Sequence, residues 1–180
     1  MGTGIIVCGL NGSGKSTLGK ALAEALAFHF IDAEDLYFSK IKTGYCYDSP
    51  RSREEAEKLL VDTVQKHEHF VLAAVKGDYG ESVLSLYRCA VLLDAPKEIR
   101  MQRVRDRSFQ RFGKRTLPGG DLYEREEAFF KMAESRRLHE VEEWTKSLDC
   151  PIFCLDGTRP VEENVARIRD EMIDCGLWGR

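Results

Sequence analysis

The sequence predicts an α/β fold, specifically a three-layer sandwich around a five-stranded, mostly parallel sheet. Two observations lead to this prediction. Short apolar runs typical of buried strands recur along the chain, and segments with apolar residues at helical spacing separate them. The 180 residues suit one domain, and no repeat, linker or low-complexity stretch divides them. We therefore expect residues 1–180 to form a single domain.

Five apolar runs are expected to form the strands. In chain order they are residues 4–8, 28–32, 70–75, 89–94 and 151–155. The third run is apolar at every position, as a parallel strand covered on both faces should be. The first ends at a glycine, which favours a turn directly after the strand.

Helical segments lie between these runs. From Lys15 onward, Leu18, Leu22 and Leu26 recur on one helical face. Further helices are expected from a capping-box pattern at Ser52, near 81–87, from Pro96 to 112, along a long amphipathic segment at 129–148, and from 161 to 172. Two irregular regions, about 36–52 and 108–120, are insertions of the kind in which binding loops and lids lie.

Composition and charge exclude several classes of protein. Apolar residues make up 43% of the chain and charged residues 32%, and the formal net charge is −3, so general binding of polyanions is not expected. No apolar run approaches the roughly 18 residues that cross a bilayer. The first residues lack a basic segment, so we expect no signal peptide. Six cysteines without a CxxC pair favour reduced thiols in the cytoplasm, with a zinc site or redox pair as the alternative.

A glycine-rich loop after the first strand carries the strongest functional signal. It reads Gly9-Leu10-Asn11-Gly12-Ser13-Gly14-Lys15-Ser16, the Walker A pattern between a strand and a helix. Its backbone N–H groups and the following helix start bind phosphate. We expect Asn11, Gly12, Ser13, Gly14, Lys15, Ser16 and Thr17 to hold ATP, with the Ser16 hydroxyl on Mg²⁺. Lys15 is expected to reach the β- and γ-phosphates and to be catalytic.

Acidic residues close the second strand. Asp32 lies where strand ends meet over the ligand crevice, so it is placed to touch the Mg²⁺ shell or to activate an acceptor hydroxyl. Helix capping is the alternative role. Together with the glycine-rich loop, this pattern resembles the small P-loop kinases: shikimate kinase, gluconate kinase and, more distantly, adenylate kinase. The resemblance implies a P-loop NTPase fold with a short lid at about 108–120. It also implies that Asp32 serves the metal and that Asp35, or Glu34, contacts the acceptor.

The acceptor side is expected near the insertion at about 36–52. Arg51, like Arg53, is a candidate for holding an anionic acceptor, although a solvated loop is an equal alternative. The spacing of Lys76 and Tyr79 resembles gluconate kinase, which implies that Lys76 faces the acceptor. The third strand does not end in an acid, and for this reason we assign Mg²⁺ support to Asp32.

A basic segment follows the fourth strand. Residues 97–115 contain eight Lys or Arg and two acids. Arg103, Arg107 and Arg111 share one helical face, where they can stabilise the charge of a transferring phosphoryl group. Arg107 is the expected catalytic arginine, and Arg103 and Arg111 are expected to bind ATP. A solvated helix face and a nucleic-acid patch are the alternatives.

Two later segments complete the expected site through the resemblance. A loop after the last strand, with Thr158, Arg159 and Pro160, is expected to hold the adenine, as related kinases do. One of Arg136 and Arg137 matches the position of a phosphate-facing arginine in adenylate kinases.

The sequence thus predicts an ATP- and Mg²⁺-dependent phosphotransferase acting on a small molecule, cytoplasmic, and a monomer or homodimer. The main alternative is a P-loop ATPase or nucleotide switch without a small-molecule acceptor. In such proteins a glutamate often follows the aspartate at a strand end, but Ala95 follows Asp94 here. ATP-linked handling of nucleic acid is a third possibility. The identity of the acceptor is not predicted.

Overall fold

The computed structural model describes residues 2–38 and 45–177. Within these ranges the sheet has five strands in the order β2-β3-β1-β4-β5, and all neighbouring strands run parallel. The strands are β1 (Thr3–Cys8), β2 (His29–Asp32), β3 (His69–Ala74), β4 (Tyr87–Asp94) and β5 (Ile152–Asp156). The predicted α/β class is confirmed, and the sheet is parallel throughout.

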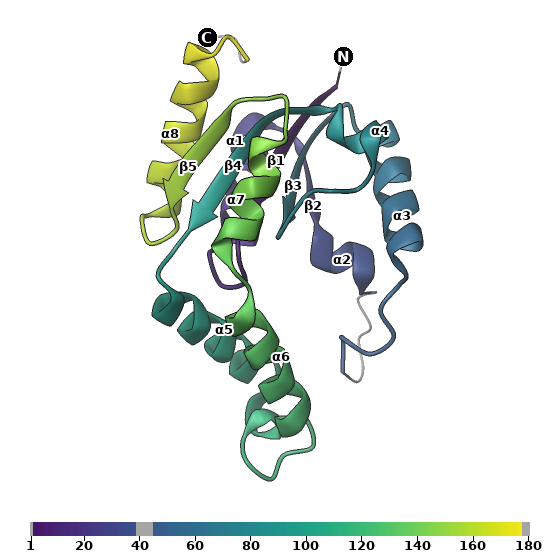
Figure 1. Ribbon diagram of the computed structural model, residues 1–180, viewed down its shortest axis with the longest axis vertical. Coiled ribbons are helices and arrows are strands. Elements are labelled where there is room, and N and C mark those ends of the chain that lie inside the picture. Colours follow the sequence, from purple (N-terminus) through teal and green to yellow (C-terminus); the bar gives the residue numbers. More distant parts are fainter. Residues whose placement is uncertain (1, 39–44, 178–180) are drawn as a thin grey trace.

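Helices cover both faces of this sheet, which gives three layers (Figure 1). The covering helices are α1 (Lys15–Leu26), α2 (Ala33–Tyr37), α3 (Arg53–Lys66), α4 (Glu81–Leu84), α7 (Leu138–Lys146) and α8 (Val161–Asp174). On one face Ile5 and Val7 of β1 pack with residues of α1 and α8. On the other face Ile6 and Cys8 pack with residues of α2, α3, α4 and α7. This alternation along β1 buries both sides of the central strand, as its continuous apolar sequence predicts.

A helical hairpin projects beyond the carboxyl ends of the strands (Figure 1). It consists of α5 (Lys97–Phe112), a 3₁₀ turn η1 (Gly113–Thr116) and α6 (Tyr123–Ser135). The long amphipathic segment expected at 129–148 is therefore two helices, because Arg136 and Arg137 adopt extended backbone angles between them. Neither proline nor glycine marks this break, so the sequence gives no local signal for it.

The short helix α2 was not predicted from the sequence. Asp32 is its N-cap, and Oδ1 of Asp32 accepts a hydrogen bond from the backbone N–H of Glu34 at 3.0 Å. A five-residue helix is too short to show apolar periodicity. The capping role that we considered as an alternative for Asp32 is thus present in the structure.

The carboxyl ends of the strands meet at one edge of the sheet. Cys8 pairs with Ala74 of β3 and with Leu92 of β4, and Asp32 pairs with Ala73. The loop that follows β1 therefore opens between its two neighbouring strands, where ligands of open parallel sheets bind. Among the described residues, no helix is both long enough and apolar enough to cross a membrane.

Candidate functional site

The phosphate loop, residues 9–16, joins the central strand β1 to α1. Gly12 has a φ of 80°, and a Cβ atom there would lie 2.2 Å from the carbonyl oxygen of Arg100. Only glycine fits this position. Gly14 caps the start of α1 with a φ of 101°. The backbone is thus curled at the start of a helix, which is the arrangement that binds phosphate.

A buried hydroxyl in this loop points to a ligand. Ser13 is 0% exposed, and its Oγ atom has no hydrogen-bond partner among the residues that the structure describes. Leaving a buried hydroxyl unpaired costs about 1–3 kcal/mol. A nucleotide bound at the loop would restore a partner, so the loop fits the ligand that the sequence predicts.

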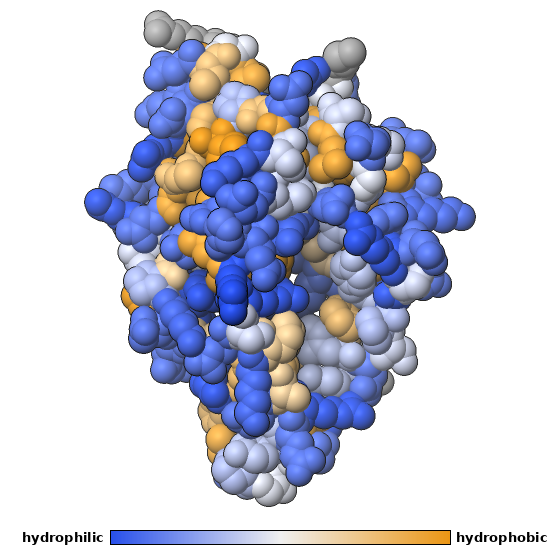
Figure 2. All heavy atoms as spheres, in the orientation of Figure 1, coloured by the Kyte–Doolittle hydropathy of each residue, from blue (hydrophilic) through white to orange (hydrophobic). Residues whose placement is uncertain are grey.

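A cavity of about 480 Å³ lies beside the loop, between the sheet and the helical hairpin. In the space-filling view the surface is hollowed between these two parts of the molecule (Figure 2). We call this cavity the main cavity. Its polar lining residues are Asn11, Lys15, Ser16, Asp32, Glu34, Tyr37, Tyr45, Tyr47, Lys76, Tyr79, Arg107 and Arg136. The fold thus brings together residues from the phosphate loop, the end of β2, the segment after β3 and the helical hairpin.

The ammonium group of Lys15 is surrounded by protein atoms, although part of the side chain faces the cavity. Burial lowers the pKa of Lys15 to about 8, and the positive charges of Arg107 and Arg136 act in the same direction. The negative charges of Asp32 and Glu34 oppose this shift. A phosphate group here would compensate the clustered positive charge and hold Lys15 in its protonated form.

Two carboxylates line the cavity at the start of α2. Glu34 accepts hydrogen bonds from the hydroxyl of Tyr47 at 3.0 Å and from the guanidinium of Arg111 at 3.1 Å, both at Oε1. Asp32 uses only Oδ1 for its cap hydrogen bond, and its second oxygen takes no part in that cap. Asp32 is therefore the carboxylate better placed to serve a metal or an acceptor.

The arginines of α5 point toward the phosphate loop in succession. Arg100 is 5% exposed and donates to the carbonyl oxygens of Ala95 and Asn11. Arg103 donates from Nη1 to the carbonyl oxygens of Gly12 and Gly157, at 3.3 and 3.0 Å. The helix is thus anchored to the loop by its first arginines.

The later arginines of α5 lie further from the loop. Arg107 lines the cavity itself. Arg111 is held by Glu34 and Tyr47 and does not line it. Arg115, at the tip of the hairpin, forms an exposed ion pair with Asp121 at 2.6 Å.

Arg136 is the cavity residue that the sequence indicated least clearly. Its Nη1 donates to Oδ1 of Asn11 in the phosphate loop at 2.9 Å. Burial lowers the pKa of Arg136, and Glu140 partly opposes this shift. The break between α6 and α7 directs this side chain inward, whereas Arg137 next to it does not line the cavity beside the phosphate loop.

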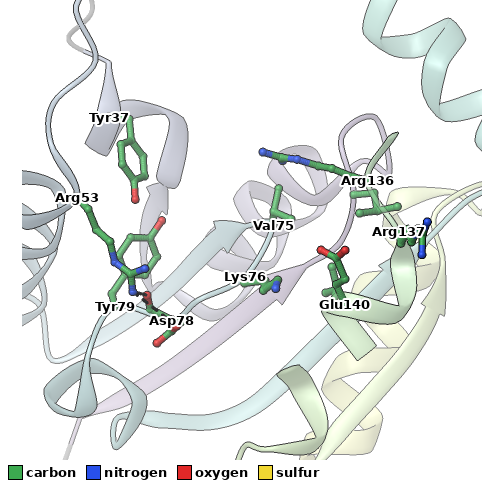
Figure 3. Close-up of a pocket in the computed structure, with 11 residues that line it drawn as sticks. Tyr37, Arg53, Val75, Lys76, Asp78, Tyr79, Arg136, Arg137 and Glu140 are labelled. Carbon is green, nitrogen blue, oxygen red and sulfur yellow. Dashed lines mark hydrogen bonds and ion pairs between the residues drawn. The ribbon is translucent and has the colours of Figure 1, made fainter. Parts of the chain in front are cut away.

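A second cavity of about 380 Å³ adjoins the first and shares Tyr37, Lys76, Tyr79 and Arg136 with it. Figure 3 shows Arg136, Arg137 and Glu140 on one side of this space, Tyr37, Tyr79, Arg53 and Asp78 on the other, and Lys76 between them. Arg53 is occupied by Glu57 at 2.7 Å and by the carbonyl oxygen of Asp78 at 3.0 Å. Lys76 lines both cavities and therefore lies where they join.

The loop after β5 borders a smaller hollow of about 220 Å³ on the far side of the phosphate loop. Ser13, Gly14, Thr17, Arg103, Gly157 and Arg159 are among its lining residues. Asp156 shapes the loop, because its Oδ1 accepts from the backbone N–H and the hydroxyl of Thr158 at 2.8 and 2.6 Å. These hydrogen bonds lower the pKa of Asp156. Thr158 and Pro160 do not line the hollow.

Two predicted acceptor residues are not brought into the main cavity. Asp35 is exposed and does not line it. Nη1 of Arg51 donates to the carbonyl oxygens of Asp35 and Leu36, at 3.2 and 3.0 Å, so Arg51 stabilises the end of α2. Part of the insertion expected at about 36–52, namely residues 39–44, lies outside the described residues.

The donor atoms at the site suit Mg²⁺ rather than zinc. The Ser16 hydroxyl and the Asp32 carboxylate line the same cavity, and both are oxygen ligands. Within residues 2–38 and 45–177 there is no group of three or more His, Cys, Asp or Glu side chains that could hold a metal. Mg²⁺ commonly binds one or two protein oxygens and completes its shell with phosphates and water, so this sparse set fits it. All six cysteines are free thiols.

Comparison with protein families and curated proteins gives two matches. A family model described as an AAA domain matches residues 5–128, which include the phosphate loop, the strands β1 to β4 and most of the helical hairpin. The uncharacterized protein YqaC of Bacillus subtilis (strain 168) is 32% identical over 176 residues, which cover 92% of this chain and 95% of that protein.

Solved structures give the same fold. Shikimate kinase from Aquifex aeolicus has 20% identity and a TM-score of 0.52, with 98% of this chain and 100% of that chain covered. Shikimate kinase from Bacteroides thetaiotaomicron has 18% identity and a TM-score of 0.55, with 96% and 99% covered. A putative kinase from Chloroflexus aurantiacus has 15% identity and a TM-score of 0.60, with 96% and 97% covered. The chain belongs to the AAA domain family and has the fold of the small P-loop kinases.

Proposed function

We propose that this protein transfers the γ-phosphoryl group of ATP to a hydroxyl or phosphate of a small molecule. The observation that carries the proposal is one cavity lined by Lys15 and Ser16 of the phosphate loop, by Asp32, and by Arg107 and Arg136. Phosphoryl transfer requires positioning and cations on the moving charge more than covalent help from the protein. This cavity offers a loop that can position the phosphates, cations that can stabilise the moving charge, and a carboxylate.

In this proposal each residue has a distinct role. The loop backbone and Lys15 hold the phosphates, and Arg107 and Arg136 stabilise the charge of the transferring group. Ser16 would hold Mg²⁺ and Asp32 would support it through water in the metal's shell; Mg²⁺ offsets the negative charge of the phosphates when it is bound. Asp32 is also close enough to the same space to accept the proton of an acceptor hydroxyl.

The adenine would occupy the hollow beside Gly157 and Arg159. Arg103 bonds to the backbone of the phosphate loop and to that of the loop after β5, so it fixes the distance between the proposed phosphate and adenine regions. Lys76, at the junction of the two cavities, would face the acceptor.

We further propose that residues 1–180 act as one domain, with about 108–120 as the lid and about 36–52 as the acceptor-side insertion. A cytoplasmic monomer or homodimer, with a small molecule rather than nucleic acid as its partner, agrees with this activity. A switch or ATPase is less well supported, because Asp94, the aspartate that would serve hydrolysis, does not line the main cavity.

A coupled assay for ADP release tests the proposal. The protein is incubated with ATP and Mg²⁺ together with nucleosides, nucleoside monophosphates, sugar acids or shikimate-like acids. At least one class should raise ADP release well above the rate with ATP alone, and the phosphorylated acceptor should be recovered. Constant ADP release across all four classes would contradict the kinase proposal and favour an ATPase.

A further inference from the structure

One wall of the main cavity is aromatic. Tyr37, Phe38, Tyr45, Tyr47 and Phe129 line it, and each of these residues is only partly buried. The rings support one another: Phe38 lies edge-on to Tyr47 at 5.1 Å between centroids, and Tyr47 stacks with Phe129 at 6.3 Å. Aromatic surface left open inside a cavity is typical of a ligand contact.

The hydroxyl groups of this aromatic wall are bonded to the protein. Tyr45 donates to Oε1 of the buried Glu126 at 2.5 Å, and Tyr47 donates to Glu34. The guanidinium of Arg111 lies 5.1 Å from the ring centroid of Tyr47 and donates to its hydroxyl at 2.8 Å. These contacts fix the two tyrosines in place and occupy their hydroxyl groups, so the wall offers a ligand mainly aromatic carbon surface.

The carboxylate beside the phosphate loop suits a neutral second substrate. Among the described lining residues, the cations are Lys15, Lys76, Arg107 and Arg136, and the acids are Asp32 and Glu34. Glu34 is already paired with Arg111 at 3.1 Å. Asp32 is the carboxylate proposed to lie next to the reacting hydroxyl, and an anionic acceptor would place a second negative charge beside it.

We infer that the acceptor is an uncharged alcohol carrying a flat ring, of the nucleoside class, whose ring lies against the aromatic wall. This inference rests on the kinase activity proposed above and names the substrate of that site. The hydroxyl oxygen of the acceptor forms the new bond to the γ-phosphorus as the bond to the β–γ bridging oxygen breaks. The hydroxyl proton passes to Asp32, and ADP leaves with the bond's electron pair.

Binding tests the inference separately from catalysis. The protein is saturated with a non-hydrolysable ATP analogue and Mg²⁺, and titration calorimetry is performed with adenosine, cytidine and thymidine, and with gluconate and shikimate. At least one nucleoside should bind at least tenfold more tightly than either acid. Tighter binding of the acids, or no binding of any nucleoside, overturns the inference.

A pair of phenylalanine variants tests whether the nucleoside ring binds at the aromatic wall. Phe129→Leu removes a ring from the aromatic wall, whereas Phe109→Leu changes a phenylalanine of α5 that is 48% exposed and lies outside the cavity. Because stacking on an aromatic side chain strengthens the binding of a base, Phe129→Leu should weaken nucleoside binding about tenfold. It should leave ATP-analogue binding unchanged, and Phe109→Leu should change neither. Equal effects of the two variants would overturn the assignment.

The two proposals fail in different ways. If sugar acids or shikimate-like acids accept the phosphoryl group and nucleosides do not, the kinase proposal stands and the neutral-acceptor inference is wrong. If nucleosides bind at the wall and ADP release never depends on them or on another acceptor, the wall is a nucleoside site and the kinase proposal is wrong.

Discussion

Arg136 donates a hydrogen bond of 2.9 Å to Asn11, so the residue that follows the helical hairpin is tied directly to the phosphate loop. The two residues are 125 positions apart in the chain. Arg136 also lines both cavities, the one beside Lys15 and the one beside Lys76. It therefore lies between the proposed donor and acceptor sides, and its position depends on the break between α6 and α7.

Replacing Arg136 by lysine should reduce phosphoryl transfer. A lysine keeps the charge but lacks the planar fork that can reach Asn11 and a phosphate together. We expect kcat/KM for ATP to fall by about 10- to 100-fold, or about 1.4–2.7 kcal/mol of transition-state stabilisation. Arg137→Lys is the matched control, since Arg137 lines the second cavity but not the one beside Lys15, so kcat/KM for ATP should change little. Equal losses in the two variants would contradict the role given to Arg136.

Lys15→Met should abolish ATP turnover while the protein stays folded. The substitution removes the cation that holds the phosphates and also removes a buried charge, so the melting temperature should not fall. Steady-state ADP release and circular dichroism measure the two effects. Lys20→Met, on the exposed side of α1, is the control. Unimpaired turnover by Lys15→Met would refute the phosphate-loop assignment.

ATP binding should weaken as the pH rises above about 8. Since the pKa of Lys15 in the free protein is lowered to about 8, the lysine is charged below this value and neutral above it. Only the charged form attracts phosphate, so the dissociation constant should increase about tenfold per pH unit above that point. Titration calorimetry between pH 6.5 and 9.5 measures it. Lys15→Met should lack this dependence, and a flat profile in the wild-type protein would be the contrary result.

The lowered pKa of Lys15 also affects the stability of the fold. The effect has the opposite sign to that of a lysine in a salt bridge, whose pKa is raised. The unfolded chain has the usual pKa of 10.5 for Lys15, so between about pH 8 and 10.5 the unfolded state binds more protons than the folded state. The contribution of this group to stability therefore rises with pH across that window, and its cost is fully present below pH 8. Urea unfolding of wild type and Lys15→Met at pH 7 and 9.5 would reveal the difference.

Gly12→Ala should disable the phosphate loop more than a comparable glycine substitution elsewhere. Gly12 and Gly119 both have positive φ values, 80° and 87°, so alanine is strained in both. Only at Gly12 would the new Cβ meet backbone, 2.2 Å from the carbonyl oxygen of Arg100, since Gly119 has no atom within 4 Å. Gly119→Ala should cost about 1–2 kcal/mol and retain ATP binding. If Gly12→Ala bound ATP as well as Gly119→Ala does, the close packing of the phosphate loop would not matter for ATP binding.

Glu126→Gln should loosen the helical hairpin. Glu126 is 1% exposed and accepts hydrogen bonds from Tyr45 and from Ser108, each at 2.5 Å. An amide is neutral and offers one acceptor oxygen in place of two, so both hydroxyls lose a charged partner and one of them loses its acceptor, at a cost of roughly 2 kcal/mol. Thermal unfolding should show a melting point lower by about 6 °C.

Glu127→Gln is the comparison for Glu126→Gln. Glu127 pairs with Arg105 at the surface, at 2.7 Å, and such exposed pairs contribute little. Its melting point should stay within about 2 °C of wild type. If the two variants had the same melting point, the buried carboxylate of Glu126 would not be the group that holds Tyr45 to the hairpin.

The phosphate-loop side of the candidate site was largely predictable from sequence, and the side opposite it was not. The phosphate-loop assignment and the face shared by Arg103 and Arg107 follow from local patterns, in which short spacings determine which side chains point together. Arg51 is a candidate because of its charge and Asp35 because of the family resemblance, and the fold directs both away from the cavity. Their directions depend on α2, a helix too short to leave a periodic signal.

By itself the sequence determined the α/β class, the order of the strands along the chain and the position of the phosphate loop between β1 and α1. These features depend on periodicity and on glycine spacing, which act over a few residues. Only the tertiary structure decided that Arg136, Asp32 and the aromatic wall meet in one cavity beside Lys15. Such contacts join segments distant in the chain, and they are fixed by how α7 and the helical hairpin pack against the sheet. The phosphate loop predicts that a nucleotide binds, whereas the shape of the packed cavity determines what can bind opposite it.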